Sequence, residues 1–402
     1  MHVLIHEPNF SGHRFTTVRV LIDSLLTLNS QFNVISKLTL ATTDAAVISD
    51  EFVEQLAQFS DQIEIYRLPN TNTSHNPVVK THHQLMGLRK CLQEVEVDHL
   101  YMPYTDHQLQ LLTIYKFLPG VNWWPPKPVT EVQIMLSKFA YPFTRKMSKV
   151  LSLIAVKYCG AERVHLNDTF AIDYLKLHHP SNIAHVYNIP DPITKTITID
   201  KSSARDYFQL PHDIRIIGLL GVLDERKGTD ILVEAFSQAS LRESDILLLA
   251  GRLSPSIRSL VDSKNDNRIV CLDRYLSEEE LSNAISAMDL VVAPYQQIVG
   301  SASIIIRAAI SNRMVLSADT GWAGAIIPKY QLGMTSSVKD IKAFSKSLET
   351  AIDQAQTFTT GRAAENFILY NSEQNVQDHW ISLIKKRLGL PSNSESLNTN
   401  EI

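Results

Sequence analysis

The first half of the chain alternates short apolar runs with segments whose apolar residues recur at helical spacing. The opening run at 3–5 precedes a turn at 9–13 and then apolar positions at 18, 21, 22, 25 and 26, which predicts strand, loop and helix. Strands that alternate with helices predict a parallel sheet with right-handed crossovers. Further runs of strand length lie at 34–40, 63–68, 99–103, 131–136 and 163–167.

The alternation pauses near residues 188–204 and then restarts. A stiff segment, 188–192, and a polar segment, 201–205, are typical of a linker. Beyond them, Ser277-Glu-Glu-Glu280 forms a capping box at the start of a predicted helix. The strands of a second parallel sheet are predicted at 214–220, 246–250, 268–272, 290–293 and 314–317.

Length agrees with two domains, because 402 residues exceed the size at which a single core stops growing. The fold class predicted is α/β with two Rossmann-like domains, at 1–195 and 205–372. An amphipathic segment at 375–389 predicts a helix that packs back on the N-terminal domain. The polar tail at 390–402 is predicted to be disordered.

Composition and charge exclude several classes of protein. A formal net charge of −4 lacks the overall positive charge that is typical of proteins that bind nucleic acid. Cys91, Cys159 and Cys271 lie far apart, which suggests neither disulfides nor a zinc site and favours a cytoplasmic location. His6 and Glu7 argue against a signal peptide, and no apolar run reaches 18 residues. The motifs G-x-G-x-x-G, H-E-x-x-H and G-x-S-x-G and the Walker loop are missing, which disfavours dehydrogenases, kinases and hydrolases.

Two loops that follow strands are candidate anion sites, because open parallel sheets bind ligands beyond the carboxyl ends of their strands. The first loop carries Gly12, His13 and Arg14; the alternative is a turn glycine with solvated polar neighbours. The second runs from 218 to 228 and carries Arg226 and Lys227 beside a helix start. Cations beside free N–H groups suit a diphosphate, and the alternative is solvated charges at a loop tip.

Residues 214–330, and more loosely the first half, resemble the GT-B glycosyltransferases, particularly the retaining family 4 class. The resemblance rests on four motifs in order: the loop 221–228, a strand ending in glycine at 247–251, the segment 271–276, and a helix followed by a strand ending in proline at 281–294. It implies two domains that face across a cleft and close on a nucleotide-sugar donor, with transfer to a glycan, lipid-linked or small-molecule acceptor.

The resemblance also implies roles for particular residues. Lys227, with Arg226 or Arg252, would meet the diphosphate, and Gly12 and Arg14 would approach it from the first domain. His13 of the same loop is a candidate catalytic residue. Tyr275 lies in the base-binding loop, and the donor loop contains Gly300, Ser301 and Ser303.

In its second half, the sequence departs from this family at three positions. Val222 replaces an arginine, and Val299 and Arg307 replace two glutamates, of which the second usually hydrogen-bonds the ribose; a guanidinium only donates. One explanation is a divergent subgroup in which 299–303 holds the donor, consistent with Asp319-Thr-Gly321. The other is a catalytically silent binding or scaffold protein that partners an active glycosyltransferase. An α/β protein that binds small solutes is a third class.

Asp106 follows the strand at 99–103 and is a candidate to orient an acceptor hydroxyl or the sugar; the alternative is a helix cap. A histidine that the family tends to place near the donor sugar is missing, since Ser137 and Lys138 stand there. No Asp-x-Asp triplet occurs, so neither a metal nor another cofactor is expected.

The segment 116–160 is basic and aromatic, with seven lysines and arginines, one acid, and the pair Trp123-Trp124. Two interpretations stay open: a helix lying on anionic lipid within 123–158, which would place the protein peripherally at the inner face of a membrane, or a surface helix whose apolar stripe packs on the sheet. That stripe consists of Met147, Val150, Leu151, Ile154 and Tyr158.

Overall fold

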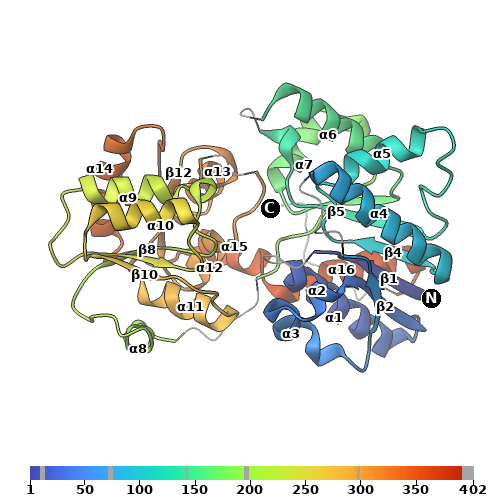
Figure 1. The fold of residues 1–402 in the computed structure, drawn as a ribbon, viewed down its shortest axis with the longest axis horizontal. Helices are drawn as coiled ribbons and strands as arrows, with labels where there is room; N and C mark the ends of the chain where they lie inside the picture. Colours follow the sequence, from blue (N-terminus) through green and yellow to red (C-terminus); the bar gives the residue numbers. More distant parts are fainter. Residues whose placement is uncertain (10–13, 71–75, 142–143, 194–198, 297–298, 392–402) are drawn as a thin grey trace. The chain divides into compact units, whose positions relative to one another are not determined.

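The computed structural model describes residues 1–9, 14–70, 76–141, 144–193, 199–296 and 299–391. The chain divides into two compact units (Figure 1): unit 1 contains 1–192 and 373–402, and unit 2 contains 193–372. Most of the tail predicted to be disordered, 392–402, lies outside the described residues. Among the described helices, none is both long enough and apolar enough to cross a bilayer.

Unit 1 is built on a seven-stranded sheet in the order β3-β2-β1-β4-β5-β6-β7, and each of its neighbouring pairs is parallel. The predicted parallel α/β fold is therefore confirmed. The last strand was not predicted, because its three residues are too few to show a pattern. The strands are β1 (His2–His6), β2 (Lys37–Thr43), β3 (Glu64–Leu68), β4 (His99–Met102), β5 (Val129–Ile134), β6 (Arg163–Leu166) and β7 (Val186–Asn188).

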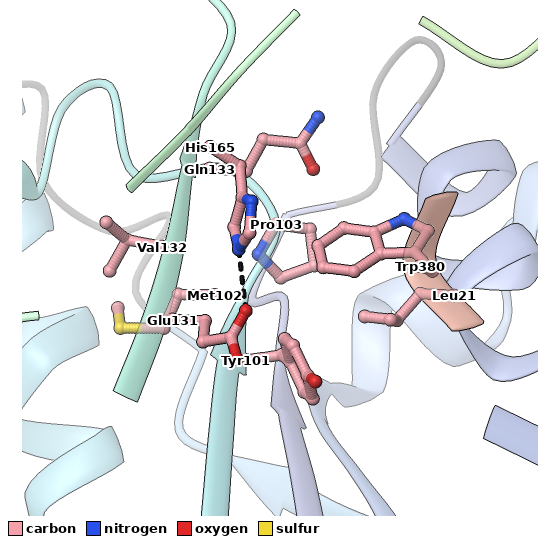
Figure 2. A pocket seen from close by; sticks show the side chains of 9 residues that line it. All are labelled: Leu21, Tyr101, Met102, Pro103, Glu131, Val132, Gln133, His165 and Trp380. Carbon is pink, nitrogen blue, oxygen red and sulfur yellow. Dashed lines mark hydrogen bonds and ion pairs between the residues drawn. The ribbon is translucent and has the colours of Figure 1, made fainter. Parts of the chain in front are cut away.

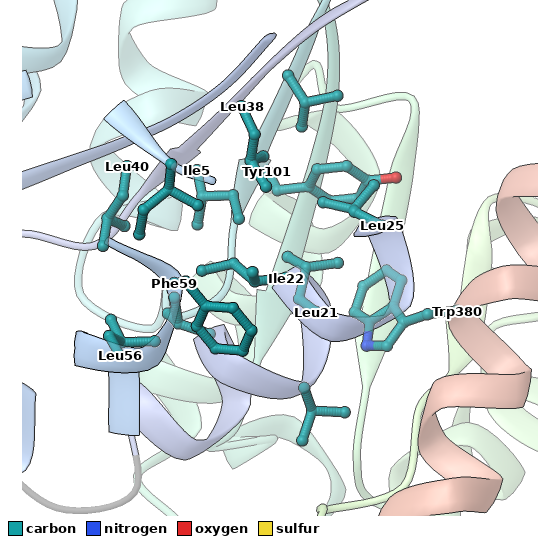
Figure 3. Packing of buried hydrophobic residues seen from close by; sticks show 14 of the residues in the cluster. Ile5, Leu21, Ile22, Leu25, Leu38, Leu40, Leu56, Phe59, Tyr101 and Trp380 are labelled. Atoms are coloured by element: carbon teal, nitrogen blue, oxygen red, sulfur yellow. The ribbon is translucent and has the colours of Figure 1, made fainter. Parts of the chain in front are cut away.

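Helices cover both faces of this sheet. On one face, Figure 3 shows side chains of α1 and Trp380 of α16 packed toward Ile5 and Tyr101 of the strands. On the other face, α4 to α7 bury Leu4, Leu100 and Val132. The helices of unit 1 are α1 (Arg14–Phe32), α2 (Asp44–Val47), α3 (Asp50–Leu56), α4 (Pro77–Glu94), α5 (Leu109–Phe117), α6 (Lys146–Tyr158), α7 (Thr169–His178) and α16 (Glu373–Leu388), with 3-10 turns η1 (Ala57–Phe59), η2 (Lys138–Ala140) and η3 (Pro180–Asn182).

The final helix, α16, packs on α1 within unit 1 although more than 300 residues separate them. An ion pair between Arg19 and Glu373, 2.5 Å long, fixes the start of α16. Buried Val376, Trp380 and Ile384 lie along one side of the helix and join the core of unit 1.

Unit 2 contains a six-stranded sheet in the order β10-β9-β8-β11-β12-β13, again with parallel pairs. The capping box at Ser277 and Glu280 begins α11, as predicted. Figure 1 shows α9 and α10 on one side of the sheet and α8 and α11 on the other. The strands are β8 (Ile216–Leu220), β9 (Ile246–Ala250), β10 (Ile269–Leu272), β11 (Leu290–Ala293), β12 (Met314–Ala318) and β13 (Gly333–Ser336), and the helices are α8 (Lys201–Tyr207), α9 (Thr229–Gln238), α10 (Pro255–Lys264), α11 (Glu278–Ala287), α12 (Ser303–Ile310), α13 (Gly321–Lys329), α14 (Ile341–Gln354) and α15 (Arg362–Tyr370), with the 3-10 turn η4 (Glu225–Lys227).

The polar segment interpreted as part of a linker is helix α8 of unit 2. Its Arg205 is 2% exposed and donates to the Ala287 carbonyl at 3.1 Å and to the Asp289 carboxylate at 2.8 Å. A buried arginine with a complete set of acceptors cannot be recognised from sequence. The polar character of this segment therefore reflects an internal ion pair as well as solvent exposure.

In both sheets the strand order reverses direction beside the first strand. The reversal lies between β1 and β4 in unit 1 and between β8 and β11 in unit 2. In open parallel sheets, ligands bind beyond the carboxyl ends of the strands at this point. The loops that leave these four strands are therefore the places to examine for a functional site.

Candidate functional site

The loops that leave β8 and β11 touch at the reversal point of unit 2. Gly228 has a φ of +70°, and a Cβ added there would lie 2.0 Å from the carbonyl oxygen of Pro294. Only glycine allows this approach without strain, since both the left-handed backbone and the contact exclude a side chain. Gly228 thus joins the two loops.

We expect Gly228→Ala to lower the free energy of unfolding by about 2 kcal/mol, because the new Cβ meets backbone that cannot move independently. Urea denaturation measures this change. Gly361→Ala is the matched control, since a Cβ at Gly361 meets nothing within 4 Å. Equal losses in the two variants would contradict the packing argument.

Lys227 folds back over the end of β8. Its Nζ donates to the Leu220 carbonyl at 3.1 Å, and a Cβ at Gly221, whose φ is +102°, would lie 2.4 Å from the same Nζ. Burial, reinforced by the neighbouring Arg226, lowers the pKa of Lys227 to about 8. The structure therefore places this ammonium, half-buried, at the carboxyl end of the strand and not in bulk solvent.

The backbone around Lys227 differs from the prediction of free N–H groups. Asp224 accepts from the Lys227 N–H with its side chain at 3.1 Å and from the Thr229 N–H with its carbonyl at 3.3 Å. The Gly228 N–H donates to Glu225 at 2.9 Å. An anion at this loop would therefore meet the Lys227 side chain more than the backbone.

Arg226 and Arg252 lie in different surroundings. The Arg226 side chain is 70% exposed and only 3.5 Å from the Asp224 carboxylate, so it matches the alternative of a solvated charge. Arg252 leaves β9 and lies 5.7 Å from the ring centre of Tyr275, which follows β10. The structure thus brings together two predicted site residues on neighbouring loops.

The loop that follows β11 leads into α12. Gly300 is buried with a φ of +84°, and Ser301 and Ser303 are half-buried. The N-cap residue of α12 is Ala302, which makes no side-chain capping hydrogen bond. This end of α12 lies after the strand that borders the reversal point.

Arg307 of α12 is 3% exposed and pairs with the Glu278 carboxylate at the start of α11. Its Nε and one terminal nitrogen have no hydrogen-bond partner among the described residues. The position that lacks the family's carboxylate therefore holds a buried guanidinium, and a carboxylate from another helix lies beside it.

In unit 1, Gly12 and His13 lie outside the described residues. Arg14 begins α1 and donates to both oxygens of the buried Glu7 carboxylate, at 3.0 and 3.2 Å. Its guanidinium also stacks 4.4 Å from the centre of the Tyr104 ring. Burial raises the pKa of Glu7 even beside this cation. The charge of Arg14 is thus largely balanced inside unit 1.

Asp106 does not cap α5, which was the alternative prediction. Its Oδ1 accepts the N–H groups of Met135 and Leu136 at 3.1 and 2.6 Å, so it holds the loop after β5. Burial raises its pKa. Asp106 also lines a small pocket with Lys138 and with Ser152 of α6.

A buried polar network lies between β4, β5, β6 and α16. The Glu131 carboxylate accepts from His165 at 2.6 Å, the bond shown in Figure 2. It also accepts from Arg387 of α16 at 3.1 Å, and His99 lies 3.3 Å away. Burial alone would raise the pKa of Glu131, but bonds from the two histidines hold it well below its usual range. The cavity beside it is about 10 Å³.

The structure of the basic and aromatic segment 116–160 contradicts part of each interpretation made from the sequence. Trp124 is 3% exposed and donates to the Cys159 carbonyl at 2.6 Å, so it belongs to the core. The apolar stripe of α6 does not pack on the sheet, because Met147 is 72% exposed and Ile154 is 42% exposed. The packed-stripe alternative is therefore wrong.

Two residues of these sites were missed from the sequence. Glu7 had a usable signal, a carboxylate directly after the first strand and seven residues before Arg14. Glu278 had none, since it is one of three glutamates in a capping sequence and its pairing with Arg307 depends on helix packing.

Two parallel Rossmann-like units of this topology define the GT-B fold, and solved structures agree. Sucrose-phosphate synthase from Thermosynechococcus elongatus has a TM-score of 0.75 and 14% identity, covering 97% of this chain and 99% of its own. The complex of Anabaena Alr3699/HepE with UDP-glucose has a TM-score of 0.68 and 12% identity, covering 96% and 100%. At these identities the likeness concerns the fold.

Two sequence comparisons give matches, of which the family match lies within unit 2. Residues 214–354 match the family described as Glycosyl transferases group 1. A curated relative, the GDP-mannose:glycolipid 4-beta-D-mannosyltransferase of Xanthomonas campestris pv. campestris, is 27% identical over 117 residues. That match spans 28% of this chain and about a third, 34%, of the relative.

Proposed function

We propose that this chain is a glycosyltransferase that binds a nucleotide-sugar donor on unit 2. The observation that carries the proposal is the half-buried ammonium of Lys227 at the reversal point of that sheet. The family match at 214–354 covers the same loops and supports it. A lysine held in a partly desolvated place interacts strongly with a diphosphate, because solvent screens the charges less there.

In the proposed reaction, Lys227 stabilises the charge that grows on the diphosphate as its bond to the sugar breaks. The N-terminus of α12 adds partial positive charge on the side of β11. Arg252 and Tyr275 offer a stacking surface for the base. Because no Asp-x-Asp triplet occurs, the proposal requires no metal, and activity that persists in a chelator would agree with it.

The acceptor and the stereochemistry are finer parts of the proposal. We assign an acceptor that is a glycan or is lipid-linked, because the curated relative is named for a glycolipid acceptor. A hexose and retention of configuration are proposed from the family resemblance alone. The anomeric proton signal of the product, measured by NMR, distinguishes retention from inversion.

We further propose that Glu278 supplies the carboxylate that position 307 lacks and accepts from the donor ribose. Arg307 would fix this carboxylate, since the two side chains form an ion pair. Glu278→Gln should weaken nucleotide binding roughly tenfold, the effect of one charged hydrogen bond. Calorimetry measures the affinity, and Glu279→Gln is the control because Glu279 is exposed one position further along the helix. Equal affinities of the two variants would refute the assignment.

A panel of nucleotide-diphosphate sugars tests the proposed function. One donor should raise the melting temperature and release its nucleotide when an acceptor is added. Binding without release would support the alternative, a silent partner of an active glycosyltransferase. Binding of a free sugar without any nucleotide would favour a small-solute protein.

A further inference from the structure

Exposed apolar side chains gather on α5 and α6 of unit 1. Of the 19 large hydrophobic side chains that are exposed among the described residues, eight lie on these two helices or directly after α5. Phe117 and Tyr158 join the two helices, with ring centres 6.1 Å apart. We call these eight residues the α5–α6 surface: Ile114, Phe117, Leu118, Met147, Val150, Leu151, Ile154 and Tyr158.

Helix α6 is amphipathic in the reverse of the usual sense. A surface helix normally turns its apolar stripe toward the core. Here the five apolar positions that share a face are 40–72% exposed, whereas Ala155 and Val156 are the buried residues and the polar Lys149 and Ser152 are half-buried. The apolar stripe therefore points away from unit 1.

The charges around this stripe have one sign. Residues 116–160 contain seven lysines and arginines, and their single acid, Glu131, is 1% exposed inside the network with His165. None of the seven basic side chains forms an ion pair with a described carboxylate. Lys116 and Lys157 lie 5.8 and 5.3 Å from the rings of Phe117 and Tyr158. The surface thus combines aliphatic side chains with flanking ammonium groups.

We propose that the α5–α6 surface docks unit 1 on an anionic lipid bilayer. The apolar stripe would enter the boundary between headgroups and acyl chains, and the lysines would meet lipid phosphates. A protein partner fits less well, because the centres of protein interfaces are depleted in lysine. The docking requires no catalysis, so it stands independently of the proposed function.

Sedimentation of the full chain with lipid vesicles tests the docking. The protein should bind vesicles of equal phosphatidylglycerol and phosphatidylcholine, bind pure phosphatidylcholine far less, and be released by salt. Val150→Glu should lower the affinity at least about tenfold, since it places a carboxylate in the stripe. The control is Val53→Glu, the same substitution at a position that is 59% exposed on α3, against the other face of the sheet.

A second pair of variants tests the contribution of the lysines around the apolar stripe. Lys146→Gln with Lys157→Gln should weaken binding roughly 30-fold, whereas Lys342→Gln with Lys346→Gln, exposed in unit 2, should change it little. Equal binding to both lipid mixtures, or equal effects of the test and control variants, would overturn the proposal. So would a self-association of the wild type that Val150→Glu abolishes. Nucleotide binding retained in Val150→Glu separates a loss of docking from a failure of the donor site.

Discussion

Lys227→Ala is expected to lower donor turnover on the order of 100-fold while leaving the fold intact. The side chain supplies the cation at the end of β8, and the loop backbone cannot replace it because its N–H groups already bond to Asp224 and Glu225. Stability should change little, since a lysine whose pKa is lowered by burial is disfavoured in its charged form. Steady-state release of nucleotide measures the effect, and Lys342→Ala, at an exposed position of α14 in the same unit, is the control.

The lowered pKa of Lys227 also predicts how donor affinity changes with pH. Lys227 is protonated below its pKa of about 8, so donor affinity should fall as pH rises through 8. The free energy of unfolding changes in the opposite direction. Burial of the Lys227 charge destabilises the fold at pH values below about 8, and this destabilisation disappears as the pH rises from about 8 to 10.5, the ordinary pKa of lysine. Lys227→Arg keeps its charge throughout and should bind the donor with a flatter pH profile. A wild-type affinity that stays constant from pH 7 to 9 would contradict the assignment.

Strands and helices with strong local patterns could be predicted from the sequence. The strand at 246–250 has the predicted bounds, and the capping box at Ser277 begins α11 because both of its hydrogen bonds are local. The strands β7 and β13 were missed because β7 has only three residues and β13, Gly333-Met-Thr-Ser336, contains no apolar run. Both depend on pairing with a neighbouring strand. Elements set by a pattern within a few residues can therefore be predicted from the sequence, whereas the pairing of strands across the sheet cannot.

The candidate site divides in the same way. Lys227 was predicted because a lysine-glycine pair after a strand is a local signal. Two ion pairs, Arg14 with Glu7 and Arg307 with Glu278, depend on how the elements pack and could not be predicted. They matter because a cation whose charge is neutralised by a carboxylate is less available to a ligand. Periodicity predicted the apolar stripe of α6 but not its direction, because spacing alone does not say which face a helix turns to its core.

The buried Glu131 network should make unit 1 sensitive to substitution. We expect Glu131→Ala to lower the free energy of unfolding by about 3–5 kcal/mol, because it leaves Arg387 and His165 without their shared acceptor. The loss should first loosen α16, whose Trp380 ring packs 4.8 Å from His165. Chemical denaturation followed by tryptophan fluorescence measures it. Glu162→Ala is the matched control, since Glu162 also faces Arg387, at 3.9 Å, but is 53% exposed.

Acid should act on the same network. The pKa of Glu131 is held below its ordinary value in the folded chain, so its stabilisation is complete above about pH 4.5 and is lost as pH falls toward the folded value. Burial lowers the pKa of His99, so the folded state resists its protonation and stability already begins to fall below pH 6.5. Glu131→Gln removes the first contribution and keeps the second, and its stability should therefore decline less steeply below pH 4.5 than that of the wild type. Identical acid profiles of the two proteins would show that Glu131 does not anchor α16 through its charge.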